Sequence, residues 1–279
     1  MKLKEILLTE ATFNTDEVVD FVFEYSFKNF FDELNEYIKG RRIPSAMPLL
    51  PTKTITPDIL AQNVRNETIQ NAIDTNPVTI MTGLFNDGSW YSPVKQEIHV
   101  SFSLNAYKIL KDFIDLGLSF KTIFEAGIIH QKDRPRFMHD VSGELVKSTI
   151  AHEVSHWLDD TYHNRHIHKR LRRAMSIPFE KREKALKIVR SGKSDINMTP
   201  FEIDAQVHSI KQARRKFTQQ EWDQLTLRDL FNLYPSFYTI SKRLSFSERQ
   251  EWRKLLISRL HREGLLGRNM VPEDIVNVL

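Results

Sequence analysis

The chain has 279 residues, of which 41% are hydrophobic and 27% are charged, a composition typical of a globular protein with a sizeable core. It contains no cysteine, which excludes disulfides, thiolate metal ligands, cysteine nucleophiles and CxxC redox chemistry. The formal charge of +4 is unevenly distributed, because residues 165–193 hold eleven Lys or Arg against two Glu. No stretch is apolar enough for a membrane span, and the N-terminus lacks the apolar core of a signal peptide. We therefore expect a cytoplasmic protein with no membrane contact.

The first 75 residues carry helical signals. A hydroxyl cap followed by two acids at residues 15–17, and apolar residues at helical spacing up to Gly40, predict one helix over residues 15–39. A second helix is predicted to begin at Thr56-Pro57, with proline at its favoured first position, and to end before Asn76-Pro77. We expect a helical N-terminal region over residues 1–75.

The pattern changes to strands after residue 77. Residues 78–85 and 97–103 predict two strands, and residues 86–89 between them predict a turn. In the second strand apolar and polar residues alternate, so one face is apolar and the other is polar. A helix is predicted to follow over residues 105–116.

The rest of the chain is predicted to be mostly helical. Leu145, Ile150 and Trp157 lie on the apolar side of a helix expected from Ser142 to about His163. Later helices are expected to begin near residues 199, 219 and 245. The fold class is therefore α+β, mostly helical, with a small sheet that precedes the helix from Ser142. We expect three regions: the helical N-terminal region, a core over residues 76–216, and a helical C-terminal region over residues 217–279.

The segment His152-Glu153-Val154-Ser155-His156 has the HExxH pattern of a metal site. Histidines four residues apart on a helix lie on one face, so both imidazoles can bind one zinc ion at about 2.0–2.1 Å. Glu153 lies about 100° around the helix, where its carboxylate can act as a general base beside the metal. Two solvated histidines on an exposed helix are the alternative. The apolar residues Ile150 and Trp157 argue against it, because they predict a largely buried helix.

Residues 150–157 resemble the active helix of the zincin metallopeptidases. The resemblance implies a zincin-like core with one Zn²⁺, bound by His152, His156 and a third ligand later in the chain, and peptide-bond hydrolysis with Glu153 as the base. The metzincin pattern would need Gly at position 159 and His at position 162, where this chain has Asp159 and Tyr162. Peptide deformylases share the motif but need a cysteine ligand.

Residues 199–206 resemble the downstream ExxA segment of gluzincin-like peptidases. The resemblance implies that Glu202 is the third zinc ligand and that Ala205 allows close helix packing. It also places Gln206 where other members have an acid or amide that orients a histidine ligand. Two alternatives remain. Glu202 could instead form a capping box with Thr199, or the third ligand could be one of Asp159, Asp160 and His163. Asp204 points away from Glu202 on the same helix.

The resemblance also implies residues that contact the substrate. Zincins often stabilise the oxyanion of the reaction with a His or Tyr, and the candidates here are Tyr162, His163, His166, His168 and His208. They usually hold an extended peptide against an edge strand beside the active helix. The strand 97–103 is the candidate, with Ile98, His99 and Val100 at its middle.

The sequence therefore predicts a hydrolase, a zinc metalloprotease that acts on a peptide or protein. A general similarity to predicted metallopeptidases of tailed phages would place it in the host cytoplasm or the virion. An alternative is a structural or interaction protein, such as a phage particle component or a regulator, that retains a zincin fold. A third hypothesis is a nucleic-acid binder that uses residues 165–193. That segment has a single aromatic residue, so a solvated helix face is its simpler interpretation.

Overall fold

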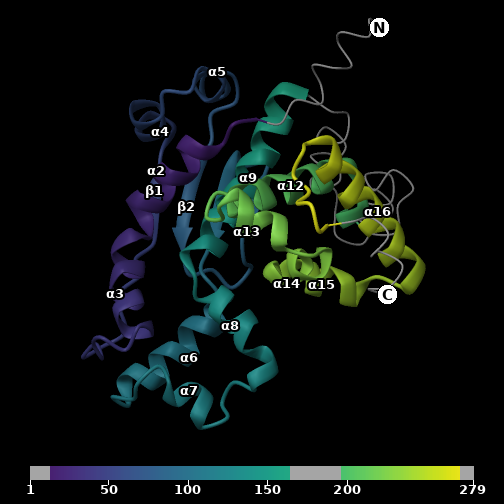
Figure 1. Cartoon of the computed structure of the whole chain (residues 1–279). Helices are drawn as coiled ribbons and strands as arrows, with labels where there is room; N and C mark the ends of the chain where they lie inside the picture. Colours follow the sequence, from purple (N-terminus) through teal and green to yellow (C-terminus); the bar gives the residue numbers. More distant parts are fainter. Residues whose placement is uncertain (1–12, 164–195, 271–279) are drawn as a thin grey trace, which may run out of the picture.

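The computed structural model describes residues 13–163 and 196–270, and it shows an α+β fold in which helices surround a small mixed sheet (Figure 1). The strand order is β1-β2-β4-β3, in which β2 and β4 are parallel and the outer pairs are antiparallel. The strands are β1 (Lys53–Ile55), β2 (Thr79–Gly83), β3 (Trp90–Ser92) and β4 (Glu97–Ser101). The predicted fold class, with the sheet before the HExxH helix, is confirmed.

The two predicted strands, β2 and β4, are shorter than expected and pair directly with each other, with Thr79 opposite Glu97 and Gly83 opposite Ser101. The strand β3 pairs with the other side of β4 and places Tyr91 opposite Ile98. β4 is therefore an inner strand, and β3 is the edge. Both β1 and β3 were missed because three residues are too few to show a two-residue alternation.

The helices of the N-terminal region are more broken than predicted. The expected helix over residues 15–39 is interrupted at Phe27, whose φ of −118° departs from helical values while its ring packs against those of Phe23 and Phe31. The expected second helix is also divided, because the side chain of Asn66 caps a new start by accepting the N–H of Ile69 at 3.2 Å. The four helices are α2 (Asp16–Ser26), α3 (Lys28–Ile38), α4 (Pro57–Asn63) and α5 (Glu67–Thr75).

Two hydrophobic cores divide the described residues. The first core joins buried side chains from Val18 to Leu158 and includes the N-terminal helices, the sheet and the HExxH helix. The second core joins Met198 to Met270. The boundary expected at residue 75 does not separate two cores, because residues on both sides of it pack together. The expected region 76–216 draws on both cores.

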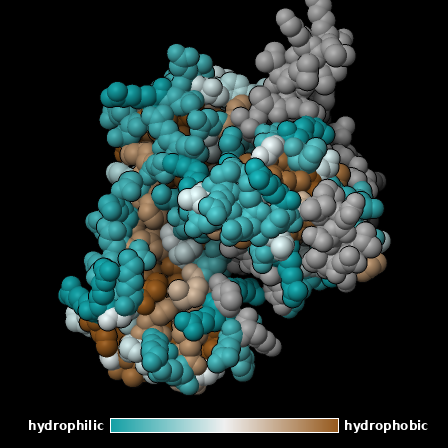
Figure 2. Space-filling view, in the orientation of Figure 1, coloured by the Kyte–Doolittle hydropathy of each residue, from teal (hydrophilic) through white to brown (hydrophobic). Residues whose placement is uncertain are grey.

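The remaining helices lie on either side of the HExxH helix along the chain. The helices predicted near residues 105, 199, 219 and 245 are confirmed, whereas α7, α8, α14 and α15 were not predicted. Their bounds are α6 (Leu104–Asp115), α7 (Thr122–Glu125), α8 (Arg134–Asp140), α12 (Pro200–Arg214), α13 (Gln219–Gln224), α14 (Leu227–Leu233), α15 (Pro235–Arg243) and α16 (Phe246–Arg262). Within the described residues no helix combines the length and apolar character of a membrane span. On the face in Figure 2 most of the surface is hydrophilic, and apolar residues gather near α3, α6 and α7.

The HExxH motif lies on α9 (Gly143–Leu158), a central helix that packs against β4, α2 and α12 (Figure 1). Ser142 caps its start by accepting the N–H of Leu145 at 3.4 Å. Ile150 and Trp157 are fully buried, as their spacing predicted. The Trp157 indole N–H donates to the carbonyl of Asn76 at 2.7 Å and ties the helix to the start of β2. The regular helix ends earlier than expected and continues as a π-helical turn over Asp159–His163.

Candidate metal centre

Helices from the two cores bring three ligand-type side chains to one point. His152 and His156 lie one turn apart on α9, and Glu202 lies in the first turn of α12. The Nε2 atoms of the two histidines are 3.2 Å apart. Carboxylate oxygens of Glu202 lie 3.5 Å from Nε2 of His152 and 3.6 Å from Nε2 of His156. Within the described part of the chain, this is the group whose ligand atoms all lie within 4.8 Å of one another.

The distances between these atoms fit a tetrahedral zinc ion. Zn–N bonds of about 2.0–2.1 Å at tetrahedral angles place two nitrogens roughly 3.3 Å apart, and the observed Nε2 separation is 3.2 Å. Two imidazoles and one carboxylate also leave a fourth position for water or substrate, as in catalytic zinc sites. The three side chains keep 10–23% of their surface exposed, so a small ligand can approach that position.

The carboxylate of Glu202 faces the two histidines and does not close a capping box. Thr199 is the N-cap of α12, but its side chain makes no capping hydrogen bond. Asp204 lies on the other side of the helix and forms an ion pair with Arg259 of α16 at 2.8 Å. α12 therefore presents Glu202 to α9 and Asp204 to the second core.

The other residues considered as a third ligand are not part of this group among the described residues. Asp160 accepts a hydrogen bond from the hydroxyl of Tyr91 at 2.8 Å. Asp159 is buried beside it in the π-helical turn. The side chain of His163 lies outside the described part of the chain. Glu202 is thus the carboxylate that the packing of α9 and α12 brings to the two histidines.

Glu153 lies beside the three candidate ligands, next to His152 on α9. Its side chain is buried, with 6% exposed, and the backbone N–H of Tyr91 donates to its carboxylate. Burial raises the pKa of Glu153 to about 7, while His152 and the Tyr91 N–H act in the opposite direction. A carboxyl group with a pKa near neutrality can accept a proton in one step and release it in another.

The pKa of Glu202 is shifted in the opposite direction from that of Glu153. Burial acts to raise its pKa, but the neighbouring His156 and His152 outweigh burial and hold the pKa of Glu202 well below its usual range. It therefore remains ionised, as a metal ligand must be. His208, on the same helix, is also buried, and burial lowers its pKa to about 3 with a smaller effect from Lys211. Its imidazole is neutral at physiological pH.

A cavity of about 530 Å³ opens at this site. It is lined by His152, Glu153 and Glu202, by the loop before β3, and by α15 of the second core. Its volume is within the range of about 300–1,000 Å³ that is usual for small-ligand sites. A substrate in this cavity would contact the ligand group and Glu153 at the same time.

The supporting residues expected around the metal are arranged differently from the sequence prediction. Gln206 lines the cavity, but its amide donates to the carbonyl of Asn197 at 3.4 Å and accepts from the Trp252 indole at 3.0 Å. It therefore anchors α12 to the second core and does not orient a histidine. The Tyr162 hydroxyl donates to the carbonyl of Thr68 on α5. That bond turns Tyr162 toward the N-terminal helices and away from an oxyanion position. His166, His168 and the basic segment 165–193 lie outside the described residues.

The prediction that β4 is an edge strand and pairs with the substrate is wrong. β4 is hydrogen-bonded on both edges, so it cannot accept a peptide as a further strand. Ile98 and Val100 are fully buried in the first core. The ring of His99 stacks on Trp90, with their centroids 3.8 Å apart. The edge strand beside α9 is β3, and its Tyr91 joins the strand to Glu153 and Asp160.

Comparisons with family models, with curated proteins and with solved structures find no match to this chain. The chemistry of the site must therefore be argued from the residues themselves. Sequence reasoning missed Tyr91 and the α15 wall of the cavity. The signal for β3 was Trp90-Tyr91 directly after the turn at residues 86–89, because aromatic residues favour strands.

Proposed function

We propose that this chain is a zinc-dependent peptide hydrolase. The observation that carries the proposal is the convergence of His152, His156 and Glu202 at tetrahedral spacing. A buried carboxylate, Glu153, lies beside them and shares their cavity. A structural zinc site is closed by four protein ligands and has no use for a general base. Three ligands, an adjacent base and a cavity together favour catalysis.

The residues fit zinc better than they fit Mg²⁺ or Ca²⁺. Two imidazoles and a carboxylate are borderline ligands, whereas Mg²⁺ and Ca²⁺ prefer sites made of oxygen alone. Bound there, zinc would supply Lewis acidity and a water molecule that ionises near neutral pH. His152 and His156 would hold the ion through their Nε2 atoms, and the ionised Glu202 would offset part of its positive charge.

In this proposal Glu153 is the residue that moves the proton. Its carboxylate accepts a proton from the attacking water and delivers it to the leaving amine. Burial raises the pKa of Glu153 above its ordinary value, which makes its carboxylate a stronger base. The N–H of Tyr91 keeps the carboxylate in place against the edge strand.

The first test is zinc content by elemental analysis of the purified wild-type protein and of Glu202→Ala. We expect one zinc per chain in the wild type and a sharp loss in the variant, because two histidines alone bind zinc weakly. Glu125→Ala on α7 is the matched control, since Glu125 is an exposed glutamate paired with Lys121, and it should keep its zinc. Absence of zinc from the wild type after reconstitution would contradict the proposal.

The second test separates the metal from the chemistry. Glu153→Gln should keep the zinc content of the wild type and lose about 10²–10⁴-fold in the rate of peptide hydrolysis, the usual contribution of a general base. Hydrolysis is measured by mass spectrometry on a mixture of unmodified peptides. Full activity in this variant would exclude Glu153 as the base.

A further inference from the structure

The cavity continues beyond the metal centre along the first half of α9. From His152 it extends past Ser148 and Thr149 to Leu145, two turns nearer the start of the helix. On a helix this distance is about 10 Å. The cavity is therefore long enough to hold part of a substrate that the metal ligands do not touch.

Apolar side chains of α9 and α15 line part of this extension. Leu145 is partly exposed and belongs to neither of the two hydrophobic cores that the described residues form. Phe237 and Ile240 of α15 line the same cavity from the second core. An apolar side chain that enters this recess would gain hydrophobic contacts that the unbound protein lacks.

A cation lies where the recess meets solvent. Arg243, the last residue of α15, lines the cavity, is exposed, and makes no ion pair with any described residue. Its guanidinium is free to bind a carboxylate of a substrate. A single cavity therefore contains the candidate metal ligands, an apolar recess and the positive charge of Arg243.

We propose that the recess formed by Leu145, Phe237 and Ile240 is a specificity pocket for a large apolar side chain of the substrate. The substrate class is then peptides that carry Leu, Phe or a similar residue next to the cleaved bond. Arg243 adds a smaller preference for an acidic residue beside it. This inference rests on the proposed peptide hydrolysis for the identity of the ligand as a peptide.

The test measures peptide binding to zinc-loaded Glu153→Gln protein, which keeps the peptides intact, by titration calorimetry. The probes are amide-capped Gly-Gly-Leu-Asp, Gly-Gly-Ser-Asp and Gly-Gly-Leu-Lys. We expect the change from Leu to Ser to weaken binding about ten- to a hundred-fold, which corresponds to the free energy of burying one leucine side chain. The change from Asp to Lys should weaken it about two- to five-fold, since Arg243 is exposed.

Two variants in the same background locate the preference. Leu145→Glu should abolish the discrimination between the Leu and Ser peptides and keep the zinc content. It is compatible with folding, because a glutamate in the first turn of a helix is favourable. Leu116→Glu makes the same change at an exposed leucine outside the cavity and should retain the discrimination. Arg243→Glu should reverse the preference between the Asp and Lys peptides.

Equal binding of the Leu and Ser peptides, no measurable binding of the Leu peptide, or discrimination that persists in Leu145→Glu would each overturn the proposed pocket. Hydrolysis by the wild type is measured separately. Selective binding without hydrolysis would support the specificity pocket and contradict the proposed peptidase activity. Hydrolysis without selective binding would support the peptidase activity and contradict the pocket.

Discussion

The two cores contribute to the metal centre in different ways. The first core provides α9, on which His152, Glu153 and His156 follow one another within five residues. The second core provides α12, which contributes a single candidate ligand, Glu202. One half of the site is therefore encoded by a local spacing, whereas the other half exists only when the two helices pack. A metal ion held by both would act as a link between the cores.

The largest expected effect comes from breaking that link. Zinc that binds only the packed helices should stabilise the protein by about 4 kcal/mol when free zinc exceeds its Kd a thousand-fold. Urea unfolding of the wild type with zinc and with a chelator measures this difference. Glu202→Ala is the control, and its stability should not respond to zinc. If zinc stabilises both proteins equally, the metal binds α9 alone and the link does not exist.

A second prediction concerns the packing that carries Glu202 to the histidines. Ala205 is fully buried and lies between Glu202 and Ser209 on the α12 face toward α9, where the Ser209 hydroxyl donates to the carbonyl of Ser148 at 3.0 Å. Ala205→Leu would push the helices apart, so we expect a loss of about 1–3 kcal/mol in unfolding free energy together with a loss of zinc.

Ala213→Leu is the matched control for this change. Ala213 is 4% exposed and belongs to the second core, about 16 Å beyond Glu202 along α12. A similar destabilisation is expected there, with zinc content unchanged. Equal loss of zinc in both variants would mean that general destabilisation, and not the spacing of α9 and α12 beside Glu202, removes the metal.

The difference between the cores also explains what the sequence could predict. The four-residue spacing of His152 and His156 already places both rings on one helix face, and the structure brings their Nε2 atoms to 3.2 Å. For Glu202 the sequence allowed two roles, a capping box with Thr199 or a metal ligand. Only the packing of α12 on α9 decides between them, because both arrangements satisfy the local rules.

Strand neighbours and cavity walls were less accessible to sequence reasoning. β4 has the alternation of a strand with one apolar face, and this pattern does not reveal that β2 and β3 pair on its two sides. α14 begins with a capping box of Thr226 and Asp229, a signal that the sequence does carry. The approach of α15 to the metal centre depends on contacts between distant segments, which no local pattern encodes.

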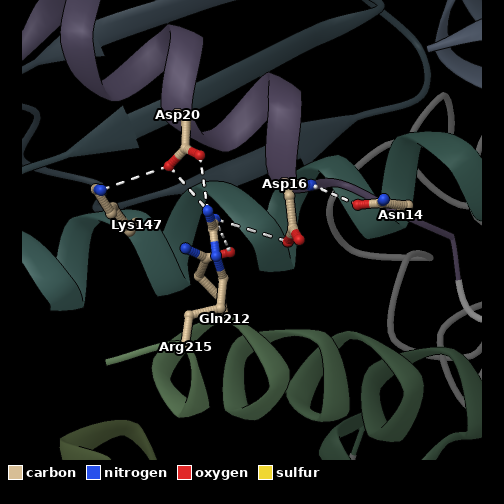
Figure 3. Close-up of polar contacts among 6 residues, drawn as sticks. All are labelled: Asn14, Asp16, Asp20, Lys147, Gln212 and Arg215. Carbon is tan, nitrogen blue, oxygen red and sulfur yellow. Dashed lines mark hydrogen bonds and ion pairs between the residues drawn. The ribbon is translucent and has the colours of Figure 1, made fainter. Parts of the chain in front are cut away.

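The smallest expected effect is at a second connection between the cores, near the surface (Figure 3). Arg215, just after α12, forms an ion pair with Asp20 of α2 at 2.8 Å, and Lys147 of α9 lies 3.4 Å from the same carboxylate. The side chains of Arg215 and Asp20 are 41% and 42% exposed, so solvent weakens their attraction. We expect Arg215→Ala to lower the free energy of unfolding by less than about 1 kcal/mol at pH 7 and to leave the zinc content unchanged.

The contribution of the Arg215–Asp20 ion pair to stability should decrease at low pH. Burial acts to raise the pKa of Asp20, but Arg215 and Lys147 outweigh it and hold the folded pKa below the ordinary 3.8. The ion pair therefore contributes stability above that value, and the contribution is lost as the pH falls through the folded pKa. The difference in urea unfolding between the wild type and Arg215→Ala should accordingly shrink from pH 7 to pH 3. A difference that is independent of pH would show that Arg215 acts through packing of its side chain. In that case the peripheral contact, like the central one, would depend on how closely the helices approach.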